Sequence, residues 1–122
     1  MTADIITADL LADVDVPVLT ALQCQGDVAV IPTSGTPGGV PVPAAGIPVV
    51  RGENGGHTHT LVGEGLLWAP SDDLLDMGAV TVPAGGVAYL LHPEHAAVAF
   101  AEGVWRVRRQ REQADEIRRV AD

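Results

Sequence analysis

The chain has little cysteine, little positive charge and few aromatic residues. Its 122 residues include one cysteine (Cys24), two tryptophans, one tyrosine, one phenylalanine and no lysine. A single cysteine excludes an internal disulfide and a multi-cysteine zinc or iron–sulfur site. Seven basic residues against 16 acidic ones give a formal net charge of −9. We therefore expect no nucleic-acid partner, because phosphate would be repelled.

The sequence also lacks a charged leader and a long apolar run. Residues 1–11 contain Asp4 and Asp9 but no basic residue, unlike a secretory signal peptide. No apolar run approaches the roughly 18 residues of a membrane span. We therefore expect no signal peptide, no membrane partner and a cytoplasmic or particle-associated location.

What the sequence does contain is a regular series of short strand signals. Its length predicts one domain, residues 1–122. Apolar segments that end at glycine or proline turns predict a small antiparallel β-barrel or sandwich over residues 26–109. The expected strands are Asp27–Pro32, Ile47–Arg51, His57–Val62, Leu66–Ala69, Ala79–Val82, Val87–His92, Ala96–Phe100 and Val104–Arg109.

Both ends of the chain show helical spacing instead. Apolar residues within 4–24, including Leu11, Val18, Leu19 and Leu22, predict an N-terminal helical arm over residues 1–25. The segment Gln110–Ala121 predicts a C-terminal helix within the tail, residues 110–122. The expected fold class is mainly β, with an N-terminal helical segment and a C-terminal helix.

Charge is unevenly distributed along the chain. Residues 1–105 hold one base and twelve acids, whereas residues 106–122 hold six arginines and four acids. A basic tail on an acidic body indicates a homo-oligomer or a larger protein assembly, in which the tail contacts a neighbour. A solvated tail helix and an anionic ligand remain open as alternatives.

Four histidines form the candidate site. His57 and His59 alternate along an expected strand, so both imidazoles point to one face. His92 and His95 lie at the end of another expected strand. If the two pairs meet, these four side chains predict a site for zinc, nickel, copper or iron, with Glu64 and Glu94 as the nearest carboxylates. The alternative is a structural hydrogen-bond network, including a pH-sensitive contact.

Residues 55–65, G-G-H-T-H-T-L-V-G-E-G, resemble the first cupin motif. The resemblance implies a β-barrel in which His57, His59 and Glu64 bind a metal. Residues 82–88, V-P-A-G-G-V-A, resemble the second cupin motif, but Ala88 stands where that family has another histidine ligand. A cupin-like metalloenzyme is therefore an alternative function.

A longer stretch resembles a group of small uncharacterised bacterial and phage-associated proteins. The resemblance rests on Q-G-D-V at 25–28, G-H-T-H at 56–59 and H-P-E-H followed by Q-R-E at 92–112. It implies one unit and no particular chemistry. We therefore expect a non-enzymatic, homo-oligomeric structural or binding module, with an accessory component of a larger particle, such as a phage assembly, as a further alternative.

Overall fold

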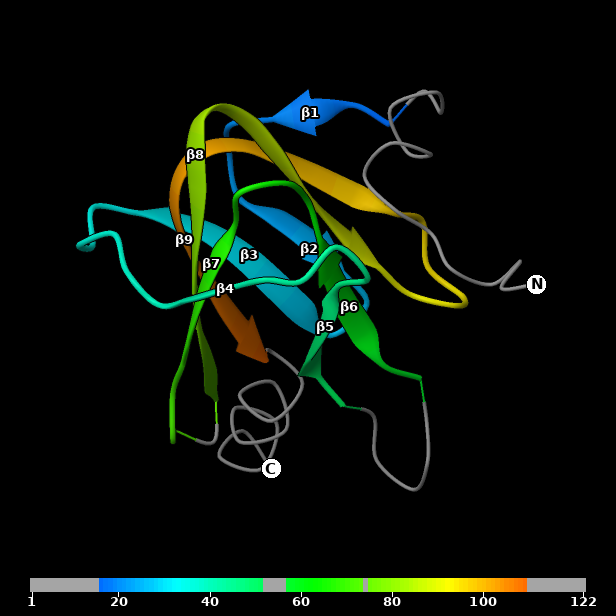
Figure 1. Ribbon diagram of the computed structural model, residues 1–122. Coiled ribbons are helices and arrows are strands. Elements are labelled where there is room, and N and C mark those ends of the chain that lie inside the picture. The colour runs from blue at the N-terminus through cyan, green and yellow to red at the C-terminus, as the bar shows by residue number, and fades with distance from the viewer. Residues whose placement is uncertain (1–15, 52–56, 74, 110–122) are drawn as a thin grey trace.

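The computed structural model describes residues 16–51, 57–73 and 75–109 (Figure 1). Every regular element in these residues is a strand. The described residues contain no helix long and apolar enough to span a membrane. The strands are β1 (Val18–Leu19), β2 (Gln23–Gln25), β3 (Val28–Thr33), β4 (Val40–Pro41), β5 (Ile47–Val50), β6 (His59–Val62), β7 (Leu67–Pro70), β8 (Asp76–Leu91) and β9 (Val98–Arg109).

The strands form one curled sheet that wraps into a half-barrel (Figure 1). Its main path runs β2–β3–β9–β8–β6–β5, and all neighbours on this path are antiparallel. β7 pairs antiparallel with β8 and β4 pairs antiparallel with β7, whereas β1 pairs parallel with β9. The first part of β8 lies beside β7 and its last part beside β6, so this strand serves both halves of the curl.

The long hairpin of β8 and β9 bends at a bulge. Val82 pairs with Gly103 and Val87 pairs with Ala101, so residues 83–86 face Glu102 alone. A Glu102 side-chain oxygen accepts the backbone N–H of Gly85 at 3.1 Å, which holds the bulge. The turn signals at 83–86 and 101–103 therefore bend two long strands and do not separate four short ones.

Apolar side chains fill one main core. Along β8, Val80 and Val82 alternate with less buried neighbours, as expected for a strand with one buried face. The rings of Phe100 and Trp105 pack with centroids 5.0 Å apart. Trp105 donates its indole N–H to the carbonyl of Ala101 at 2.9 Å, so its polar atom is satisfied. The buried aromatic pair anchors β9 in this core.

The β-rich character predicted from the sequence is confirmed, but the predicted fold class is wrong in two respects. Val18–Leu19 and Gln23–Gln25 form strands, although helical spacing predicted a helix there. Hydrogen bonds to the edge of β9 and to the carbonyls around the β8–β9 loop outweigh this local pattern. The sheet is also an open half-barrel, not a closed barrel or a sandwich. The predicted helix over Gln110–Ala121 and the first part of the helical arm lie outside the described residues.

Candidate functional site

The sheet brings the four histidines of the sequence together. Antiparallel pairing places Thr60 of β6 opposite Leu91 of β8, so His59 lies close to His92 at the start of the β8–β9 loop, residues 92–97. The ring centroid of His92 lies 4.5 Å from that of His59, 4.5 Å from that of His95 and 5.4 Å from that of His57. The sheet therefore places the four candidate residues near one another.

His59 is the buried member of this cluster, with 3% of its surface exposed. Its Nδ1 atom lies 2.9 Å from Oε1 of Gln25. Because an amide oxygen can only accept, Nδ1 of His59 carries the proton and donates. In the neutral ring, Nε2 is then unprotonated, and it lies 3.7 Å from Oδ1 of Asp27.

Gln25 fixes the direction of that hydrogen bond. Its Nε2 atom donates to the carbonyl of Leu90 at 2.7 Å and to that of Ala96 at 2.9 Å. These two carbonyl acceptors determine which end of the amide carries nitrogen, so Oε1 must face His59. The side chain is 1% exposed and joins β2 to the end of β8 and to the β8–β9 loop.

Gln23, two residues earlier on β2, acts in the same way. Its Nε2 atom donates to the carbonyl of Ala99 at 2.8 Å. Residues two apart on a strand point to the same side, so both glutamines bond with carbonyls of the long hairpin. Side-chain amides of β2 therefore satisfy backbone acceptors of β8, β9 and the loop between them.

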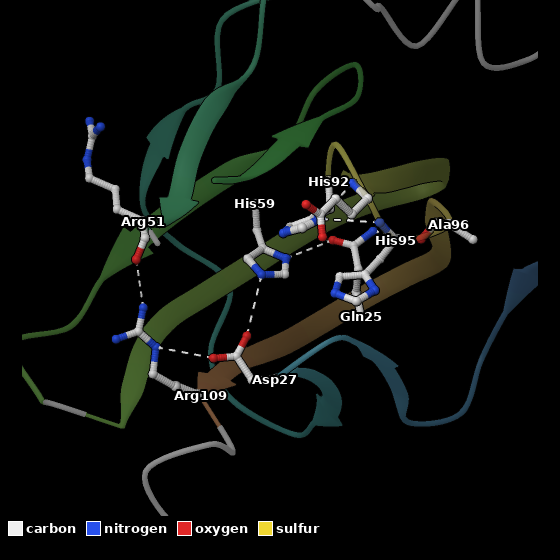
Figure 2. A network of polar contacts seen from close by, with 9 residues as sticks. Gln25, Asp27, Arg51, His59, His92, His95, Ala96 and Arg109 are labelled. Atoms are coloured by element: carbon white, nitrogen blue, oxygen red, sulfur yellow. Dashed lines mark hydrogen bonds and ion pairs between the residues drawn. The ribbon is translucent and has the colours of Figure 1, made fainter. Parts of the chain in front are cut away.

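The contacts continue on the other side of His59 (Figure 2). Oδ2 of Asp27 lies 4.0 Å from Nε of Arg109, at the end of β9. Arg109 also donates a guanidinium N–H to the carbonyl of Arg51 at 2.8 Å. A chain of polar contacts thus runs from the end of β5 through the β2–β3 turn and His59 to the β8–β9 loop.

His92 holds the β8–β9 loop by a local contact. Its Nδ1 atom accepts the backbone N–H of Glu94 at 3.0 Å and that of His95 at 3.2 Å. An accepting Nδ1 is unprotonated, so the proton of the neutral His92 ring is on Nε2. Glu94 in turn reaches His57, with Oε1 2.6 Å from Nε2 of that ring.

Gly26 brings the β2–β3 turn against the same loop. Its φ of +62° lies in the left-handed region that favours glycine. A Cβ atom at this position would lie 2.7 Å from Nε2 of His95. The turn therefore requires glycine both for its backbone conformation and for its contact with the histidine ring.

Burial and neighbouring charges keep two of the histidines neutral. Burial, which has the largest effect, and the neighbouring His92 together lower the pKa of His59 to about 4, although Asp27 opposes this effect. The pKa of His92 is also lowered, first by burial and then by His95 and His57. His59 and His92 therefore resist protonation near neutral pH.

The contacts of these rings do not match the predicted metal site. In residues 16–51, 57–73 and 75–109, no group of three or more His, Cys, Asp or Glu side chains is arranged to hold a metal ion. His92 uses Nδ1 as an acceptor and carries its proton on Nε2, which leaves no lone pair for a metal. Glu64, the carboxylate implied by the cupin resemblance, lies exposed in the turn after β6.

Sequence analysis missed the residues that connect the cluster to the sheet: Gln25, Asp27 and Arg109. Gln25 and Asp27 belong to the Q-G-D-V segment, which was recognised as a motif but given no role. The signal in the sequence was the pair Gln23 and Gln25, polar residues two apart beside a strand.

We call the assembled set the histidine clasp: Gln25, Asp27, His57, His59, His92 and His95.

Comparisons with known proteins identify a family without an assigned activity. No curated protein and no solved structure gave a significant match. Residues 24–110 match the family described as "Domain of unknown function (DUF8820)". This stretch extends from the strand that carries Gln25 to the end of β9, and so includes the whole histidine clasp. The match covers more than half of the chain, which therefore belongs to the DUF8820 family.

Proposed function

We propose that this protein is a non-enzymatic structural or binding module that works as a homo-oligomer. The observation that carries the proposal is a set of exposed apolar side chains at one edge of the sheet. Val18 and Leu19 form β1, and Leu22, which is 52% exposed, directly precedes β2. Burying such side chains against a second copy of the chain would remove them from water.

The position of β1 supports the same proposal. Among the described strands, β1 pairs only with β9, so its other edge is open to further pairing. Open edges protected by symmetric association are common in small β proteins.

The contacts within the histidine clasp support a cupin-like metalloenzyme less well than they support a structural or binding module. Such an enzyme needs at least three protein ligands and an open coordination position. His59 is almost fully buried, and His92 already uses its Nδ1 atom to hold the loop. An accessory role in a larger particle remains compatible with the apolar edge, and it differs from a homo-oligomer in the mass of the isolated protein.

Light scattering of the full chain tests the proposal. We expect a mass of two or more chains for the natural protein and a shift towards one chain for Leu22→Glu. The matched control is Val40→Glu, which places the same charge at another exposed apolar position, 61% exposed and on β4. A mass of one chain for the natural protein across the concentration range would reject the homo-oligomer.

A further inference from the structure

We propose that the histidine clasp is an acid-sensitive latch, which joins the β2–β3 turn to the β8–β9 loop while its imidazoles are neutral and releases the loop when they are protonated. The latch lies where the two ends of the curled sheet approach one another. Gln25 and Asp27 come from one end of the strand order, and His59 comes from β6 near the other (Figure 2). No backbone pairing joins β2 to β6 in the described sheet, so side chains make this connection.

His59 is the central contact of the latch. Its single proton is on Nδ1 and is donated to Gln25. A second proton would be placed on Nε2 and would charge a ring that is almost fully buried. That charge would lie 4.5 Å from the ring of His92, so two protonated rings would repel each other across this gap.

His92 connects protonation to the shape of the loop. In the neutral ring, Nδ1 accepts two backbone N–H groups, those of Glu94 and His95. Protonation of Nδ1 converts this acceptor into a donor, so both N–H groups would then face another donor. The turn that follows β8 would lose its cap, and the loop would lose the geometry that places Ala96 against Gln25.

Some of the surrounding charges favour protonation of His59 and His92, and others oppose it. Asp27 stabilises a protonated His59, but it also faces Arg109, which opposes that protonation. Glu94 stabilises a protonated His92, while His57 and His95 oppose it. The titratable and charged groups that face the two rings are Asp27 from the β2–β3 turn, His57 before β6, Glu94 and His95 from the β8–β9 loop, and Arg109 from β9.

The first experiment follows the linkage between protons and folding. Denaturant unfolding of the full chain is measured from pH 7.5 to pH 4.5. Below about pH 6.5, a histidine that is neutral when folded and charged when unfolded makes the unfolding equilibrium constant rise about tenfold for each unit of pH lost. We expect this dependence in the natural protein, and we expect His59→Gln to reduce it by about one proton.

The matched control is His57→Gln, which changes an exposed histidine of the same cluster. We expect it to change the pH dependence less than His59→Gln does, because His57 acts only by opposing the protonation of His92. If His59→Gln and the natural protein show the same slope, His59 is not the acid-sensitive group and the proposal is rejected. The slope is measured for each variant against its own stability at pH 7.5, so a general loss of stability does not imitate the effect.

A second experiment needs no variant. Nitrogen NMR of the natural protein at pH 7 should show His59 protonated on Nδ1 alone and His92 on Nε2 alone. Hydrogen exchange of the Glu94 and His95 amides, corrected for intrinsic rates, should accelerate by roughly fivefold or more at pH 5, as expected for loss of a hydrogen bond. Unchanged protection of both amides would contradict release of the loop.

Elemental analysis separates the latch from a metal site. Protein purified without an affinity tag should contain less than about 0.1 equivalent of zinc, nickel, copper or iron per chain, because Nδ1 of His59 and Nδ1 of His92 are already engaged in hydrogen bonds. A stoichiometric metal that His57→Gln and His59→Gln both remove would reject the latch and would support the metal site predicted from the sequence.

Discussion

His59 and Gln25 are 34 positions apart in the sequence, yet Nδ1 of the imidazole lies 2.9 Å from Oε1 of the amide. This single contact joins β6 to β2, two strands that share no backbone ladder in the described sheet. The amide is itself held by two backbone carbonyls, so the imidazole meets an acceptor whose orientation is fixed.

Replacing Gln25 should destabilise the protein strongly. Gln25→Leu removes three hydrogen bonds and leaves the carbonyls of Leu90 and Ala96 and the Nδ1–H of His59 without this partner. We expect a loss of roughly 3 kcal/mol or more in the free energy of unfolding. Gln23→Leu, which removes the hydrogen bond to the carbonyl of Ala99, is the graded control and should cost less. Equal losses in chemical denaturation would contradict a special role for Gln25.

Acid should weaken the fold between pH 6.5 and pH 4. The pKa of His59 is lowered from 6.5 to about 4 in the folded protein, mainly by burial. The unfolded chain therefore binds more protons in this range, so stability is complete above pH 6.5 and falls as the pH is lowered. The total contribution of this group is roughly 3 kcal/mol. Unfolding free energies at a series of pH values would measure it, and a flat profile would contradict it.

Asp27→Asn should move the titration of His59 to lower pH. The Asp27 carboxylate raises the pKa of His59 against the effect of burial, so its removal leaves the lowering effects unopposed. NMR titration of the His59 ring should give a pKa below that of the natural protein. Asp73→Asn is the matched control, since Asp73 is an exposed residue whose carboxylate bonds with its own turn. A rise in the pKa of His59 in Asp27→Asn would be inconsistent with the contacts described.

Gly26→Ala should cost more stability than Gly85→Ala. Both glycines have a positive φ, +62° and +73°, so alanine is strained by about 1–2 kcal/mol at either position. A Cβ atom at Gly26 also meets His95 at 2.7 Å, whereas one at Gly85 meets no atom within 4 Å. Thermal or chemical denaturation measures the difference. Adding His95→Ala to Gly26→Ala should remove the excess, and a persistent excess would show that the contact with His95 is not its cause.

The sequence allowed the strands of this fold to be placed with some accuracy. Val28–Thr33 and Ile47–Val50 agree with the predicted segments, because β-branched residues between glycine and proline turns are typical of strands. It did not reveal that β8 and β9 are continuous. Residues 83–86 contain the glycines and proline of a chain reversal, and only pairing across the sheet determines that they form a bulge.

The prediction of a helical arm was wrong over Val18–Leu19 and Gln23–Gln25, because the local spacing of apolar residues competes with strand pairing between distant parts of the chain. Val18 and Leu19 fit a helix by their apolar spacing, but an open edge of β9 accepts them as a parallel strand. The rings of the four candidate histidines lie close together, with the ring of His92 4.5 to 5.4 Å from each of the others. The partners of their nitrogens could not be predicted, because Gln25 and Arg109 reach the site from distant strands.

The bent hairpin of β8 and β9 also affects how the protein unfolds. β8 contributes to the ladder with β7 at its beginning and to the ladder with β6 at its end, and β9 is shared in the same way between β3 and β1. Both halves of the curled sheet share β8 and β9. One half therefore cannot unfold while the other keeps all of its backbone hydrogen bonds. Heating should therefore produce a single transition with equal calorimetric and van't Hoff enthalpies in the unassociated chain.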